Sequence, residues 1–329
     1  MTQPSDPHDK LFRALLDDPE RARALLVDHL PAGVVAELAE TLPVPEDGTF
    51  VDERLRGSQS DRLFRVELAR GGFAFIYTLL EHKSQPDPRT PIQVLSYMAR
   101  IWDRYLGRCV RTPAAMPAIV PMVLYHGRAP WTVPTSMAGW LDAPAAIREQ
   151  VADFGYVLRE LGPIPDAELA RHRAVRGVLM ALKHARERGV PVELVVSLVE
   201  QTPDGSLLEL QVVEYVGRVY DMTRAELETA VRQAKPHRWE EIMGTPAEEW
   251  IEEGKQRGKA EGRAEGKAEG MAQGRAEAVL RILRGRFGEP DARLAERIRS
   301  ADLDVLDAML DLALTVEKPD DVIRGTGQH

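Results

Sequence analysis

The chain contains a single cysteine, Cys109, among its 329 residues. One thiol excludes an intramolecular disulfide and a zinc site built from several thiolates, and it suits a reducing cytoplasm. The chain also lacks an apolar run long enough to span a bilayer, and its first residues have neither the basic segment nor the apolar core of a signal peptide. We therefore expect a cytoplasmic protein that does not enter the membrane.

Positive charge is also in deficit. Lys and Arg total 43 against 52 Asp and Glu, which gives a net charge of −9. Contacts to phosphate need local positive potential, so this balance argues weakly against nucleic-acid binding without excluding it. A carboxylate site can bind a cation first, and the cation then supplies the positive charge. No segment resembles a phosphate-binding P-loop or a thiol nucleophile.

The most informative segment contains two strand-like runs on either side of Gly71 and Gly72, a pattern typical of a hairpin. If the chain folds back near Gly71, Asp61 lies opposite Glu81 to within about one residue. Side chains alternate along a strand, so Glu81 and Lys83 face the same side. The segment therefore predicts two carboxylates and an ammonium group at one end of a hairpin.

This set of groups suits the hydrolysis of a phosphodiester bond. Asp61 and Glu81 would bind Mg²⁺ or another divalent cation, because Mg²⁺ keeps several waters and needs only one or two carboxylates. The backbone carbonyl of His82 could add a third oxygen. Lys83 would orient the attacking water or offset charge in the transition state. The alternative is an exposed strand end whose acids and base form surface ion pairs.

The rest of the pattern predicts an α/β protein with a small mixed sheet flanked by helices. Residues 9–40 are helical in pattern with an interruption at Pro31, and a second helix is expected over 91–105. Residues 116–125 form a buried strand that contains prolines, so the strand should begin irregularly or lie nearer an edge. Residues 144–235 are mostly helical in pattern.

The chain changes character near Trp250, and we expect three parts. They are a nuclease-like domain over 1–240, a charged arm over 241–275 and a small all-α C-terminal domain over 276–329. Glycine recurs at every fourth position from Gly254 to Gly274, and each glycine costs a helix about 1 kcal/mol relative to alanine. The arm is either a solvated helix or flexible segment, or a helix whose glycine stripe allows a second copy to approach and form a homodimer.

Gln93 and Tyr97 lie one turn apart at the start of the second helix, after the strand that ends in Glu81 and Lys83. This arrangement resembles the Q-x-x-x-Y element of RecB-type nucleases in the PD-(D/E)xK superfamily. More specifically, the chain resembles the Rpn family of recombination-promoting nucleases, also called YhgA-like transposases. The matching stretches cover much of the chain and include 7–13, 50–55, 60–66, 79–84, 123–127 and 130–131.

The resemblance implies a restriction-endonuclease-like core that cuts DNA with Mg²⁺ or a similar ion, and a link to recombination or mobile elements. By position, Asp61 and Glu81 are the metal ligands and Lys83 is the third catalytic residue. Many relatives have Gln where this chain has Lys83. The rival interpretation is a catalytically silent nucleic-acid-binding or scaffolding protein that oligomerises through its C-terminal arm.

Other residues keep two interpretations each. Asp9 matches an acidic position on the first helix of the family that reaches the metal, or it caps that helix. Gln93 and Tyr97 support the metal site or contact DNA, or they pack beneath the sheet. His126 follows a strand and could bind phosphate or metal, or make a structural hydrogen bond.

Overall fold

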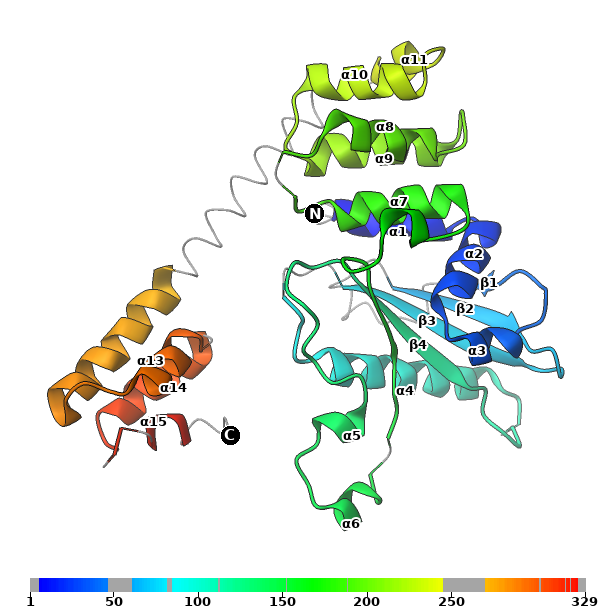
Figure 1. Ribbon diagram of the computed structural model, residues 1–329. Coiled ribbons are helices and arrows are strands. Elements are labelled where there is room, and N and C mark those ends of the chain that lie inside the picture. Colours follow the sequence, from blue (N-terminus) through cyan, green and yellow to red (C-terminus); the bar gives the residue numbers. More distant parts are fainter. Residues whose placement is uncertain are drawn as a thin grey trace. The chain divides into compact units, whose positions relative to one another are not determined.

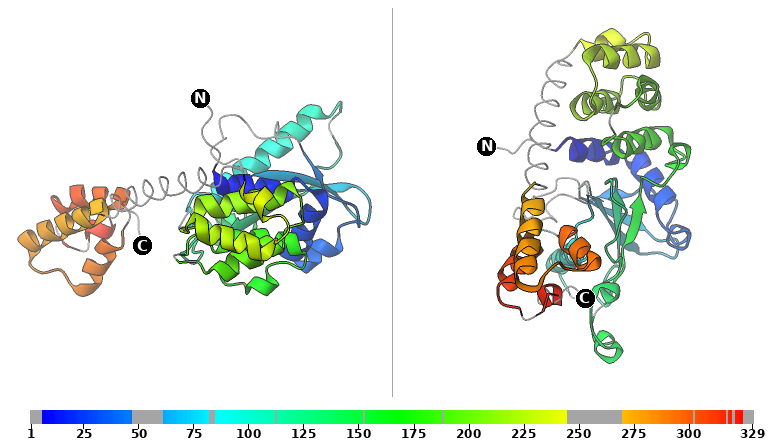
Figure 2. Two further views of the ribbon diagram at one scale, coloured as in Figure 1. Left: turned by 90° about the horizontal axis from the view of Figure 1, so that it is seen from above. Right: turned by 60° about the vertical axis from the view of Figure 1, so that its left-hand side comes forward.

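The computed structural model divides the chain into two compact units, Met1–Gly254 and Lys255–His329. The two units are shown in Figures 1 and 2 and are described separately. The structure describes residues 6–46, 61–81, 85–111, 113–151, 153–187, 189–244, 270–301, 303–316, 318–319 and 321–324.

The described part of the first unit contains a five-stranded mixed sheet in the order β1-β2-β3-β4-β5. The pairs β1–β2 and β2–β3 are antiparallel, whereas β3–β4 and β4–β5 are parallel. The strands are β1 (Val44–Pro45), β2 (Arg62–Glu67), β3 (Phe73–Glu81), β4 (Ile119–Tyr125) and β5 (Val157–Glu160). The prediction of an α/β fold with a small mixed sheet is confirmed.

Helices cover both faces of this sheet, as Figure 1 shows. The helix α4 (Thr90–Arg108) lies on one face, and α1 (Pro7–Leu16), α2 (Pro19–His29) and α7 (Arg173–Lys183) lie on the other. The remaining described helices of the unit are α3 (Ala32–Ala36), α5 (Met137–Trp140), α6 (Ala145–Arg148), the 3₁₀ helix Asp166–Glu168, α8 (Val192–Glu200), α9 (Leu207–Val219), α10 (Arg224–Ala234) and α11 (Trp239–Met243).

The central strand β3 divides its side chains between two cores. Ile76 and Leu80 belong to the larger core with α1 and α7, whereas Phe75, Tyr77 and Leu79 pack against α4. Side chains on a strand alternate between faces, and here both faces are covered. This is why the run reads as continuously apolar instead of alternating with polar residues.

The hairpin between β2 and β3 depends on two glycines. Gly71 and Gly72 have φ values of 88° and 82°, a backbone region that residues with a side chain rarely adopt. This conformation lets the amide of Leu68 donate to the carbonyl of Gly72 at 3.1 Å. The Gly-Gly signal therefore marks the turn correctly.

Two strands differ from the sequence predictions. β4 lies between β3 and β5, so its placement near an edge is wrong, although residues 116–118 precede it as irregular chain, as expected. Pro121 is accommodated inside this parallel pair, opposite Tyr77. The four-residue β5 lies inside the stretch predicted as mostly helical. Its sequence did not predict a strand, because half-buried side chains in a short edge strand show little periodicity.

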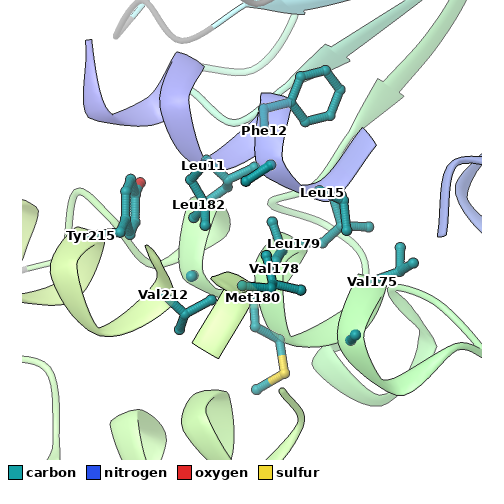
Figure 3. Close-up of a cluster of buried hydrophobic side chains, with 14 of the residues drawn as sticks. Leu11, Phe12, Leu15, Val175, Val178, Leu179, Met180, Leu182, Val212 and Tyr215 are labelled. Carbon is teal, nitrogen blue, oxygen red and sulfur yellow. The ribbon is translucent and has the colours of Figure 1, made fainter. Parts of the chain in front are cut away.

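Behind the sheet, the larger core continues into a stack of helices. Figure 3 shows Leu11 and Leu15 of α1 facing Val178 and Leu182 of α7, with Val212 of α9 beside them. Each of these five side chains is almost completely buried. α1 therefore links the sheet to the helical stack, a position that matters for the site below.

A buried ionic group holds the outer helices of this stack together. Glu209 on α9 is fully buried and pairs with Arg238 at 3.1 Å and with Lys235 at 3.6 Å. Lys235 also donates to the carbonyl of Thr202 at 2.8 Å. A buried carboxylate is tolerated only with such partners, so Glu209 fixes the ends of α10 and α11 against α9.

The second unit is helical where it is described. Residues 270–287 form a helix, followed by α13 (Ala292–Arg299), α14 (Leu303–Ala313) and α15 (Asp321–Arg324). Their apolar sides enclose a separate core that includes Val279, Leu283, Ile298 and Met309. Most of the glycine repeat lies outside the described residues, so the arm and its dimer stay predictions. No helix in the described part of the chain is both long and apolar enough to cross a membrane.

Candidate active site

The start of β2 and the end of β3 meet at one end of the sheet. Arg62 pairs with Thr78, so Asp61, just before β2, lies next to Leu79 and not opposite Glu81. The predicted register is wrong by two residues. The reason is that Glu67 pairs with Phe73, so the chain reverses one residue earlier than Gly71, and moving the centre of a hairpin by one residue moves every partner by two.

Asp61 is still close to the other candidate groups. Its carboxylate accepts hydrogen bonds from side chains on the α4 side of the sheet. The hydroxyl of Tyr77 donates to Oδ2 of Asp61 at 2.8 Å. Tyr97 on α4 also hydrogen-bonds this carboxylate, and Gln93 hydrogen-bonds Tyr97. The rings of Tyr77 and Tyr97 lie 5.0 Å apart between centroids. The network therefore joins Gln93 and Tyr97 to Asp61.

Tyr77 is a site residue that sequence reasoning missed. It lies in an apolar strand and is 1% exposed, so the sequence pattern assigns it to the core. The alternation of side chains along the strand could have identified it. Tyr77 is an even number of positions before Glu81 and therefore faces the same side of β3. A buried phenol needs a hydrogen-bond partner, and here the partner is Asp61.

The electrostatics of Asp61 follow from this surrounding. Burial is the main reason that the pKa of the Asp61 carboxyl is raised to about 7. The hydrogen bonds from Tyr77 and Tyr97 act against this rise, and the nearby carboxylates of Asp9 and Glu81 contribute to it. Burial and the negative charge of Asp61 raise the pKa of both phenols above the usual value. Both tyrosines therefore keep their protons and act as donors to Asp61.

Asp9 enters the site from α1. The helix is capped by Asp6, whose side chain accepts from the amide of His8 at 2.9 Å, so the capping interpretation of Asp9 is wrong. Asp9 is instead 4% exposed and close enough to raise the pKa of Asp61. α1 crosses this end of the sheet, since His8 at its start contacts His126 after β4, and Asp17 just after its end pairs with Arg62.

The donor set fits a hard divalent cation. The Oδ1 atom of Asp61 is buried and accepts no hydrogen bond from the described residues. Glu81, at the end of β3, is 5% exposed and close enough to raise the pKa of Asp61. Within the described ranges, no three His, Cys, Asp or Glu side chains are arranged to hold one ion together. Two carboxylates still suffice for Mg²⁺, which takes oxygen ligands and keeps several waters.

Two predicted residues of the site, Lys83 and the His82 carbonyl, lie outside the described residues. His126, which follows β4, is 3% exposed, and its amide donates to the carbonyl of Glu81 at 3.4 Å. The sheet end therefore carries Asp61, Glu81 and His126 from three neighbouring strands.

The fold and this site define a class of protein: an α/β protein with buried carboxylates gathered where β3 ends and β2 begins. The sequence profile of the family described as "Putative transposase, YhgA-like" matches residues 6–212. The chain belongs to this family of YhgA-like transposases and recombination-promoting nucleases, which confirms the resemblance found in its motifs. No solved structure shows a significant match to the chain.

Curated relatives match a similar share of the chain. Recombination-promoting nuclease RpnD of Escherichia coli O157:H7 is 34% identical over 209 residues, which are 61% of this chain and 78% of the relative. Recombination-promoting nuclease RpnA of Escherichia coli K12 is 32% identical over 60% of this chain and 65% of the relative. A protein named inactive recombination-promoting nuclease-like protein RpnE, from the same strain, is 28% identical over 56% and 60%.

Proposed function

We propose that this protein is a divalent-metal-dependent DNA endonuclease linked to recombination. The observation that carries the proposal is the buried carboxylate of Asp61, fixed by Tyr77 and Tyr97 beside Glu81 and Asp9. Membership of a family whose relatives are named nucleases gives the reaction class. Burying several acids together opposes folding, so a cation that brings them together is the simplest reason to keep them.

In this proposal each residue has a separate task. Asp61 and Glu81 hold the ion, and Tyr77 and Tyr97 keep the Asp61 carboxylate oriented. Asp9 supports the ion from α1, and Gln93 fixes the hydroxyl of Tyr97. An ion held by these residues would supply polarisation of the phosphate and a lower pKa of the attacking water.

Lys83 is the third catalytic residue in this proposal, and it orients the water or offsets charge on the phosphate. DNA is the substrate, and a homodimer through the arm would supply two sites for a double-strand cut. These assignments rest on the sequence motifs, and each can be tested by substitution.

The experiment is cleavage of supercoiled plasmid by the full chain with Mg²⁺, Mn²⁺ or EDTA. We expect Asp61→Ala and Glu81→Ala to lower the cleavage rate by at least about a hundredfold, because each removes a group that acts on the transition state through the ion. Glu67→Ala is the matched control, since Glu67 ends β2 at the opposite end of the same hairpin and is exposed. Lys83→Ala tests the remaining predicted residue.

The alternative function is a catalytically silent nucleic-acid-binding or scaffolding protein that oligomerises through its C-terminal arm. The relative named inactive is the observation that favours it. If plasmid stays intact with every divalent ion, or if the Asp61 and Glu81 variants cut as fast as the Glu67 control, the nuclease assignment fails. Light scattering of the full chain and of a chain ending at 250 tests the predicted dimer. If the arm forms the dimer, the truncated chain should lose oligomeric mass.

A further inference from the structure

A cluster of two histidines and a tyrosine lies beside the carboxylates. His8 on α1, His126 after β4 and Tyr215 on α9 come from three distant parts of the chain. The Nδ1 atom of His8 and the hydroxyl of Tyr215 are 2.7 Å apart. The rings of His8 and His126 are 5.0 Å apart between centroids and are tilted by 51°.

This cluster belongs to the same end of the sheet as the candidate active site. Glu81 pairs with Tyr125 across β3 and β4, and His126 is the next residue. His8 directly precedes Asp9, whose carboxylate raises the pKa of Asp61. The two imidazoles therefore lie beside the carboxylates, on the side of α1 and α9.

The three side chains differ in access to solvent. Tyr215 and His126 are 2% and 3% exposed, whereas His8 is half-buried. Tyr215 lies next to α1 in Figure 3. The buried pair thus contacts the ring of His8, and His8 is the most exposed of the three side chains.

We propose that His8 binds a DNA phosphate next to the bond that is cut, with Tyr215 and His126 as its positioning residues. The inference rests on the proposed function of the site. When the Tyr215 hydroxyl donates to Nδ1, Nε2 carries the hydrogen and is a donor. A site rich in carboxylates needs such donors, because a phosphodiester is repelled by acids that are not neutralised.

The test measures DNA binding in an Asp61→Asn background, by fluorescence anisotropy of a labelled duplex in Ca²⁺. Adding His8→Ala should weaken binding about tenfold, the scale of one hydrogen bond to a charged group. His8→Gln keeps a donor and should recover part of the loss. Tyr215→Phe should weaken binding less than His8→Ala, because it frees the ring without removing it.

Lys10→Ala is the matched control. Lys10 is on the same helix and pairs with Glu214 of α9 at 2.6 Å, so its removal also loosens α1 from α9. An exposed ion pair contributes little, and we expect less than about a twofold change in DNA affinity. If His8 only stabilises the packing of α1 against α9, His8→Ala and Lys10→Ala both lower the melting temperature and neither changes DNA affinity.

The outcomes separate the two proposals. If the Asp61→Asn protein binds DNA and the unmodified protein cuts it, but His8→Ala binds as tightly as Lys10→Ala, the inference about His8 is wrong and the nuclease proposal stands. If the protein neither binds nor cuts DNA under any condition, both proposals fail. A tenfold loss confined to His8→Ala, with partial recovery in His8→Gln, supports the inference.

Discussion

The two ends of the same sheet are built from opposite kinds of residue. At the end where β3 and β4 finish, Asp9, Glu81 and His126 are each no more than 5% exposed. Towards the hairpin turn, residues of α3, β2, β3 and β4 line an open cavity of about 380 Å³. Its lining is mostly apolar and includes Val34, Leu38, Val66, Leu68, Ala74, Ile76 and Val120.

This contrast separates what supports the fold from what serves the site. Burying apolar side chains favours folding, whereas burying acids opposes it unless a cation or a donor compensates. We therefore expect substitutions at the cavity end to change stability and leave cleavage unchanged. Substitutions at the carboxylate end should change cleavage and can even stabilise the fold.

The largest effect on stability is expected from Ile76→Ala. Ile76 is fully buried, and its side chain lines the cavity at the apolar end. Removing it loses transfer free energy and enlarges an existing cavity, at a cost of about 3–4 kcal/mol. Urea denaturation measures the loss, and cleavage per folded molecule should stay within about twofold of the unmodified protein. A large fall in cleavage would show that the two ends are not independent.

The second prediction concerns pH at the carboxylate end. Folding raises the pKa of Asp61 from 3.8 to about 7, so the folded protein binds more protons than the unfolded chain between these values. The free energy of unfolding therefore falls as pH rises through this window, at up to about 1.4 kcal/mol per pH unit for this group. The full cost is present above the folded pKa.

Denaturation in EDTA at acidic and at mildly alkaline pH measures this dependence. Asn cannot ionise, so Asp61→Asn should remove the contribution and make the protein more stable than the unmodified chain at alkaline pH. Adding Mg²⁺ should stabilise the unmodified protein more than the Asn variant, which keeps only part of the donor set. Identical pH dependence in the two proteins would contradict the burial of this carboxylate.

A smaller effect is expected at the hairpin turn. Gly72 has a φ of 82° and open space around the position of a Cβ atom. Gly72→Ala therefore causes no steric clash. It should lower the free energy of unfolding by about 1 kcal/mol, because alanine disfavours the left-handed backbone conformation. Thermal unfolding measures the loss. A cost several times larger would show that the turn also sets the register that brings Asp61 to the site.

The smallest effect is expected from filling the cavity. Ala74 is buried in β3 and lines the cavity, and valine suits a strand. Ala74→Val should raise the free energy of unfolding by about 0.5 kcal/mol, less than the transfer value because the cavity is open to solvent. Denaturation in urea checks the sign, and a loss of stability would show that the cavity is shaped too tightly for the added methyl groups.

The candidate site was only partly predictable, and the reasons differ among residues. The prediction that Asp61 and Glu81 lie at the same end of the sheet was possible because a hairpin is local and its glycine turn is recognisable in the sequence. The register was wrong by two residues because the exact centre of the turn depends on backbone hydrogen bonds. Tyr77 was missed because a buried tyrosine in an apolar run looks like core.

The sequence by itself determined the local elements and the family. The glycine turn, the apolar strands, the helix that carries Gln93 and Tyr97 and the motifs of the Rpn family are patterns of short range, and short-range patterns are written in neighbouring residues. Only the tertiary structure decided which distant residues meet. It brought α1 across the sheet end, so that Asp9 reaches Asp61 and His8 reaches both His126 and Tyr215. Such contacts depend on how two buried cores pack against one sheet, and no periodicity along the chain records that packing.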